Sequence, residues 1–188
     1  MSMDRIFSGA GRPGGEGAGN GRRYGVDMAK VTNIDDPEKL NRVKCKRITS
    51  DPDVGETDWM YVCSPLAGTN YGLYMMPKVG DLVLLSYLGG DVHRPFVIGS
   101  LWTKDVAAPY KIEGGKNETF SFRLPSGTEV VFSEASGKES VTITAATGAK
   151  MALDGEGKKI LVTDKDGKNA LTMDLGSGAV TVQADKKL

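Results

Sequence analysis

The sequence has few of the residues from which catalytic and metal sites are built. Its 188 residues include one histidine, His93, and two cysteines, Cys45 and Cys63. A nucleophilic triad needs a base beside its nucleophile, and these three residues lack the spacing of a zinc site. We expect His93 to lie in a surface turn and both cysteines to be buried free thiols. We therefore expect no enzyme activity, no cofactor and no metal site.

The sequence also lacks a net charge and any long hydrophobic run. Twenty-four Lys and Arg residues balance 24 Asp and Glu residues, so no overall field draws the chain to nucleic acid or anionic membranes. No apolar stretch is long enough to cross a bilayer, and residues 1–21 lack the apolar segment of a signal peptide. We expect a chain made in the cytoplasm, with no signal peptide and no transmembrane segment.

Glycine, in contrast, is abundant. Its 25 residues recur at short intervals, which favours short strands and tight turns over long helices. Residues 1–21 are polar and rich in glycine, so they are predicted to form a flexible arm. Only residues 36–40 look helical, with Asp35 or Asp36 as the N-cap and Pro37 in the first turn.

Five β-like segments follow within about 80 residues, each rich in β-branched or aromatic residues and bounded by turn formers. Because closure removes the free edges of an antiparallel sheet, these segments predict a small barrel. The oligosaccharide/oligonucleotide-binding (OB) fold is the commonest five-stranded solution. The predicted strands are residues 22–34, 41–49, 57–64, 81–88 and 94–102.

From Thr119 onward the chain repeats a turn that contains glycine and a short strand with two apolar residues at i and i+2. Two inward side chains per strand cannot build the core of a monomer. Three copies around a common axis would bury them, since each chain would supply one stripe to a narrow interior. A β-meander packed on the barrel and a monomeric solenoid are the alternatives. The predicted axis residues are Val130, Phe132, Val141, Ile143, Met151, Leu153, Ile160, Val162, Leu171, Met173, Val180 and Val182.

The predicted architecture is therefore all-β, with a five-stranded OB barrel followed by an intertwined rod of three chains, a trimeric β-helix. The expected parts are a flexible arm over residues 1–21, the barrel over 22–104, a connector over 105–118 and the spike over 119–188.

Residues 74–102 carry an ordered series of turn and apolar positions that resembles the signature of the baseplate spike family of contractile injection systems. That family includes the tailed-phage baseplate assembly protein V and the valine-glycine repeat protein G of type VI secretion. Upstream, Tyr24-Gly25, Arg42-Val43 and Trp59 extend the resemblance. The matching positions in the signature are Pro77, Val79, Gly80, Asp81, Val83, Gly89, Gly90, Asp91, Pro95, Gly99 and Ser100.

The resemblance implies a structural, membrane-piercing spike of a phage tail, tailocin or type VI-like system, made in the bacterial cytoplasm and assembled into a baseplate. It implies a homotrimer that contacts the target membrane only during injection and has no small-molecule substrate. Residues 103–118 are too short for the lysozyme domain of some members. A separate hub protein is implied at the barrel, and a proline-alanine-alanine-arginine (PAAR) type cap is possible at the tip, which has no His-x-His metal motif.

Arg42, Lys44 and Lys46 alternate along one predicted strand and must share a face. A solvated outer face, a docking face for the hub and a nucleic-acid surface are the open interpretations, in that order of preference. Trp59 and Tyr61 on the next strand could stack on bases in the last case. The alternative function is accordingly an OB-fold binding module for single-stranded nucleic acid or glycan.

Overall fold

The computed structural model describes residues 22–48 and 55–186, and the predicted arm over residues 1–21 lies outside them. The chain divides into two compact units between Ala107 and Ala108. The described residues are all-β: they contain no α-helix, only a short 3₁₀ turn at Leu88–Gly90. Within those ranges, no helix is long and apolar enough to cross a membrane.

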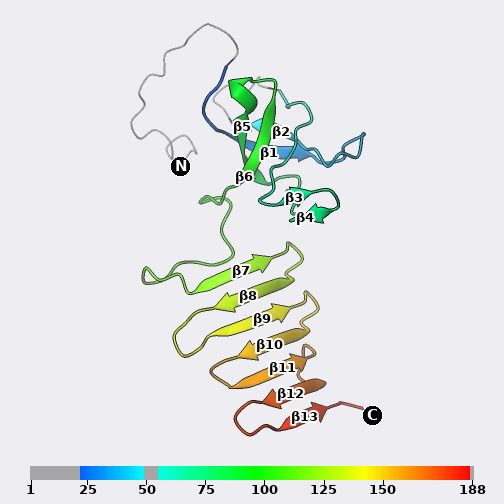
Figure 1. Ribbon diagram of the computed structural model, residues 1–188, viewed down its shortest axis with the longest axis vertical. Helices are drawn as coiled ribbons and strands as arrows, with labels where there is room; N and C mark the ends of the chain where they lie inside the picture. Colours follow the sequence, from blue (N-terminus) through cyan, green and yellow to red (C-terminus); the bar gives the residue numbers. More distant parts are fainter. Residues whose placement is uncertain (1–21, 49–54, 187–188) are drawn as a thin grey trace. The chain divides into compact units, whose positions relative to one another are not determined.

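The first unit is built around a four-stranded antiparallel sheet in the order β2-β1-β5-β6 (Figure 1). A separate two-stranded hairpin, β3-β4, follows the third predicted strand. The strands of the larger sheet are β1 (Asp27–Asn33), β2 (Lys44–Arg47), β5 (Leu82–Tyr87) and β6 (Pro95–Ser100), and those of the hairpin are β3 (Ala67–Gly68) and β4 (Tyr71–Gly72).

The predicted third strand, residues 57–64, is attached to the sheet by single β-bridges. Val43 pairs with Met60 on the β2 side, and Val62 pairs in parallel with Val97 of β6 on the other. This segment therefore links the two outer strands of the sheet, as the predicted barrel requires.

The core of the barrel is filled from every strand around it. Its fully buried cluster consists of Ala29, Val31, Val43, Cys45, Met60, Val83, Leu85 and Val97. Cys45 is buried as predicted, but the same prediction for Cys63 is wrong, because Cys63 is exposed where the chain leaves the barrel. Both thiols are free.

The short helix predicted over residues 36–40 is also wrong, because this segment forms a turn around a buried carboxylate. Asp36 accepts hydrogen bonds from the backbone N–H groups of Glu38 at 3.1 Å and Leu40 at 3.0 Å. Lys39 has a φ of 56°, in the left-handed region, so a helix cannot continue through it. The acidic residue expected as a helix cap thus organises a loop instead.

The two turns of the family signature are tight and depend on glycine. Gly80 has a φ of 97°, and its N–H donates to the carbonyl oxygen of Val31 at 2.9 Å, which ties the turn to β1. Gly89 and Gly90, in the 3₁₀ turn, have φ values of 62° and 79°. Only glycine adopts such angles at little cost, so these residues fix the entrance and exit of the buried strand β5.

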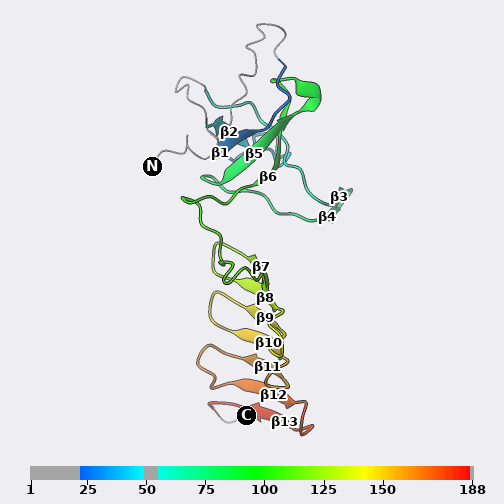
Figure 2. The same cartoon turned by 90° about the vertical axis from the view of Figure 1, so that its left-hand side faces the viewer.

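The second unit is a single antiparallel sheet of seven strands in sequence order, from β7 at one edge to β13 at the other (Figures 1 and 2). Six of them carry the predicted apolar pairs, and β7 adds a seventh strand before them. Because consecutive strands pair directly, one chain forms a single sheet, here called the wall, rather than a solenoid coil. The strands are β7 (Thr119–Arg123), β8 (Glu129–Ser133), β9 (Ser140–Thr144), β10 (Lys150–Asp154), β11 (Lys159–Thr163), β12 (Ala170–Asp174) and β13 (Val180–Gln183).

Candidate interaction surfaces

One face of the β7–β13 sheet, here called the apolar face, is made entirely of hydrophobic side chains in two columns. In each strand the register places both apolar residues directly opposite an apolar pair of the next strand. The first column is Phe120, Phe132, Val141, Leu153, Ile160, Met173 and Val180, and the second is Phe122, Val130, Ile143, Met151, Val162, Leu171 and Val182.

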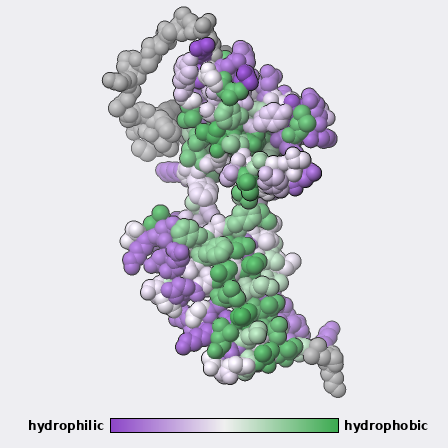
Figure 3. All heavy atoms as spheres, viewed as in Figure 1, coloured by the Kyte–Doolittle hydropathy of each residue, from purple (hydrophilic) through white to green (hydrophobic). Residues whose placement is uncertain are grey.

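Most of the apolar face is open to solvent in the single chain. The more exposed members range from Val162, with 40% of its surface accessible, to Val182, with 62%. Figure 3 shows hydrophobic residues gathered in a band along the seven strands. Soluble monomers rarely expose a contiguous apolar patch that spans a whole sheet, so this face is a candidate interaction surface.

The register brings together all twelve predicted axis residues on this face. It also adds Phe120 and Phe122, which the sequence analysis missed. Their signal was present, since Phe-Ser-Phe repeats the same i and i+2 pattern one strand earlier.

The opposite face of the sheet is mainly polar. Its outer positions hold ion pairs such as Lys159–Asp154 at 3.7 Å, with Lys138–Glu156 at 3.2 Å in the flanking turns. Its central column includes Val131 and Leu161, which are half-buried. Hydrophobic residues are thus concentrated on one face of the sheet, and the opposite face is suited to contact with water.

The cationic strand of the barrel is largely neutralised within the chain. Arg42 forms a two-pronged ion pair with Asp36, at 2.8 and 2.9 Å, and this contact, with the backbone N–H groups, holds the pKa of the Asp36 carboxyl far below its usual range. Lys44 Nζ lies 3.3 Å from Glu56 and 5.4 Å from the ring centre of Trp59.

Lys46 differs from its two neighbours. It is exposed and forms no ion pair with another residue in the described ranges. Binding to nucleic-acid phosphates relies on several unpaired protein cations, which displace counterions from the nucleic acid, and two of the three cations predicted here already have carboxylate partners. The predicted docking role of Arg42, Lys44 and Lys46 stays a prediction, centred on Lys46.

The family-signature residues surround β5 and β6. Pro77 is buried before the Gly80 turn, and Asp81 Oδ2 accepts the N–H of Lys78 at 2.8 Å. Asp91 Oδ1 likewise accepts the N–H of His93 at 2.9 Å, in an exposed turn where His93 was expected. These carboxylates cap turns. The remaining signature positions are Val79 beside Gly80, buried Val83 in β5, Gly89 and Gly90 in the 3₁₀ turn, Pro95 at the first position of β6, and Gly99 and Ser100 at its end.

In the part of the chain that the structure describes, no group of three or more His, Cys, Asp or Glu side chains could hold a metal ion. Where pKa values are shifted, the causes are burial and contacts within the fold. Burial, for example, raises the pKa of the Cys45 thiol to about 11, with a smaller contribution from the charge of Glu56.

The sequence of the barrel is similar to known proteins. The family described as type VI secretion system/phage-baseplate injector OB domain matches residues 28–102. A type VI secretion system spike protein of Pseudomonas aeruginosa, VgrG1c, is 32% identical over 78 residues, which are 40% of this chain and 11% of that protein. VgrG3, a spike protein of Vibrio cholerae, is 29% identical over 91 residues, 46% of this chain and 9% of that protein.

A further relative in Vibrio cholerae is named as an actin cross-linking toxin, VgrG1, and is 26% identical over 91 residues. The matched segments cover about a tenth of the length of these relatives. Over residues 28–102, which form the barrel, the chain thus matches an injector OB domain, and over this part it is similar to type VI secretion spike proteins.

Proposed function

We propose that this chain is the structural spike of a contractile injection system, a phage tail, tailocin or type VI-like baseplate, and acts as a homotrimer. The β7–β13 sheets of three chains would form the three walls of a hollow-free prism with the apolar faces turned inward. Seven strands stacked at about 4.8 Å make each wall roughly 30 Å long. In this arrangement the needle would be rigid, because strand pairing would be continuous along each wall.

The observation that carries this proposal is the apolar face. Its fourteen side chains pair only with one another across the strands, and in a single chain most of them contact water. A dimer would cover one such face with another but would leave a flat two-layer sandwich. Three walls around an axis place two columns of each chain inside a triangular core, which suits the narrow width of two side chains per strand.

The barrel would dock the trimer onto a separate hub, and the relatives named as spike proteins support this placement in a baseplate. Lys46 and the neighbouring outer face of β2 are the candidate contacts. A PAAR-type cap on the β13 end is compatible with Val180 and Val182, whose exposure is among the highest of the apolar face.

The mass of the purified full chain in solution, measured by light scattering on a sizing column, tests the assembly. We expect about three times 20.0 kDa at micromolar concentration. A monomer would contradict the proposal. The spike role itself is tested by deleting the coding sequence in its host and restoring it. Wild type should restore delivery or infectivity, and normal delivery without the chain would refute the role.

A further inference from the structure

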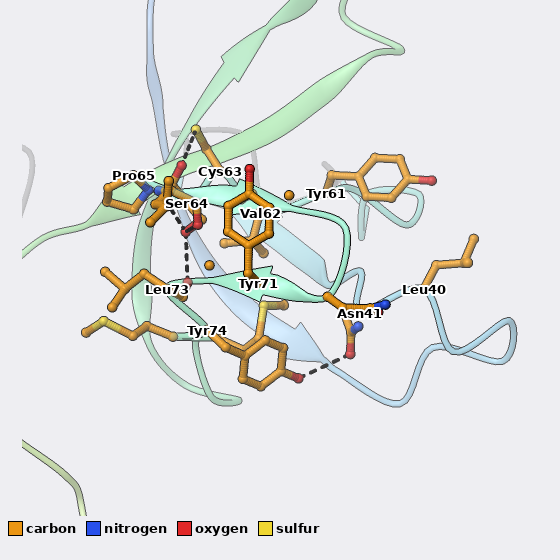
Figure 4. Close-up of a pocket in the computed structure, with 17 residues that line it drawn as sticks. Leu40, Asn41, Tyr61, Val62, Cys63, Ser64, Pro65, Tyr71, Leu73 and Tyr74 are labelled. Carbon is orange, nitrogen blue, oxygen red and sulfur yellow. Dashed lines mark hydrogen bonds between the residues drawn. The ribbon is translucent and has the colours of Figure 1, made fainter.

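The barrel carries a groove that the spike role does not use. It has a volume of about 550 Å³ and lies between the β3-β4 hairpin, the end of the third predicted strand and the loop after β1 (Figure 4). Seventeen residues line it, and none of them is charged. A volume in this range suits a small or extended ligand, and the absence of charge restricts which ligand that can be.

Two tyrosine rings are presented to solvent at this groove and are held in place from behind. The ring of Tyr71 lies directly on Gly68, so closely that a Cβ at position 68 would sit 2.2 Å from the ring carbon Cζ. The hydroxyl of Tyr74 donates to Asn41 Oδ1 at 3.1 Å. Tyr71 is nevertheless 66% exposed and Tyr74 75% exposed. Rings that are fixed yet exposed are binding platforms, because little conformational freedom is lost when a ligand covers them.

The backbone under these rings is also fixed. Ser64 Oγ lies 2.9 Å from the carbonyl oxygen of Leu66 and 2.8 Å from that of Leu73, so it ties together the two ends of the hairpin segment. The N–H of Leu73 donates to the carbonyl oxygen of Leu66 at 2.9 Å. The groove is therefore shaped before any ligand arrives.

The polar groups left at the groove are neutral. The Asn41 side-chain oxygen accepts from Tyr74, and its amide N–H groups have no acceptor among the described residues, so both donors are open to a ligand. The side chain of Asn70 has no hydrogen-bond partner among the described residues. The Tyr71 hydroxyl adds another group that can donate and accept. Amides and phenols of this kind complement hydroxyl groups without requiring a charge on the ligand.

We propose that this groove binds an uncharged oligosaccharide, with sugar rings stacked on Tyr71 and Tyr74 and hydroxyl groups bonded to Asn41 and Asn70. The carbon–hydrogen face of a pyranose is apolar and weakly positive, and the face of an aromatic ring is apolar and negative. A nucleic acid shares the stacking but needs cations for its phosphates, which the lining lacks. The site would give the barrel a contact with surface or cell-wall glycans that is independent of the rod.

The test uses the full-length chain and three uncharged probes, the hexasaccharides of N-acetylglucosamine, of cellulose and of starch. Binding is measured by titration calorimetry and by NMR chemical-shift changes of the protein. We expect wild type to bind at least one hexamer at micromolar to millimolar concentration. Tyr71→Ala and Tyr74→Ala should each weaken binding about tenfold, as expected for one lost stacking contact. Tyr24→Ala, which removes an equally exposed tyrosine outside the groove, should bind as wild type.

The Gly68→Ala variant tests whether binding depends on the position of the Tyr71 ring, because it moves the ring without removing it. The new methyl group must displace the Tyr71 ring, so binding should fall while every groove side chain is kept. Failure of wild type to bind all three hexamers at millimolar concentration would overturn the proposal. So would equal binding by Tyr71→Ala, or binding of oligo-dT or of a proline-rich peptide in place of the hexamers. The mass of each variant by light scattering shows that the assembly is unchanged, so this site and the spike role fail separately.

Discussion

Two aspartates placed on the apolar face should prevent the trimer from forming. The change is Ile160→Asp with Val162→Asp, both in β11 near the middle of the wall. Val162 is 40% exposed in the single chain, and burying that fraction contributes about 1 kcal/mol, from roughly 1.5–3 kcal/mol for a whole aliphatic side chain. Each aspartate would forfeit this contribution and add an unpaired carboxylate, which costs several kcal/mol in a dry interior.

The substitutions act at two positions in each of three chains, all around one axis. Their like charges would also repel each other across the narrow core. We therefore expect the mass measured by light scattering to fall from about three times 20.0 kDa to that of one chain. Because a protonated aspartate is neutral, lowering the pH should partly restore the trimer.

A matched variant puts the same charges on the opposite face. Ser121→Asp with Thr172→Asp changes the central column of the polar side, which would stay in water in a trimeric prism. This variant should keep the mass of wild type. If instead the β11 variant stays trimeric, or if both variants dissociate equally, the apolar face is not the trimer axis and the proposed needle is refuted.

Three further outcomes follow from the barrel. Leu85→Ala should lower the free energy of unfolding by about 2–5 kcal/mol in urea melts, because Leu85 is fully buried, whereas Leu88→Ala at an exposed position should have little effect. Asp36 has a lowered pKa, so its contribution to stability is present above pH 3.8, the value of the free group, and is lost as pH falls below it. Thermal melts of Asp36→Asn between pH 7 and pH 2 should accordingly change less with pH than those of wild type, and a parallel dependence would contradict this. A maleimide should label Cys63 but not Cys45 in the native chain at pH 7, and both in denaturant; rapid native labelling of Cys45 would show that the barrel opens.

Much of the fold was predictable because each unit repeats a simple pattern. Alternation of apolar residues located β1, β2, β5 and β6 of the barrel, although the predicted strand over residues 57–64 forms only isolated bridges. The i and i+2 pairs located the wall. The register could be expected as well, since any shift by one residue would turn apolar side chains to the polar face. Phe120 and Phe122 could have been included by the same criterion, because the predicted repeat already began at Thr119.

Other features depend on contacts that alternation does not encode. Residues 36–40 contain helix-start signals, but Asp36 is recruited by Arg42 from beyond the segment, and the local preference is overridden. Arg42 and Lys44 alternate with buried residues as a free cationic face would, although Asp36 and Glu56 neutralise them. The tyrosine groove had no signal, because the position of Tyr71 comes from one close approach to Gly68.

The two units differ in whether a single chain can bury their hydrophobic side chains. The barrel buries Leu85, Val43 and Met60 within its own sheet, so it has the core of an independent domain. In the described part of the second unit, Ala152 is the only hydrophobic residue that is buried, so the wall has almost no core of its own. If the chains assemble as proposed, the wall would fold only as it assembles, whereas the barrel would fold without a partner. The β11 aspartate variant should consequently lose the β-sheet signal of the wall and keep a cooperative unfolding transition of the barrel, reported by Trp59.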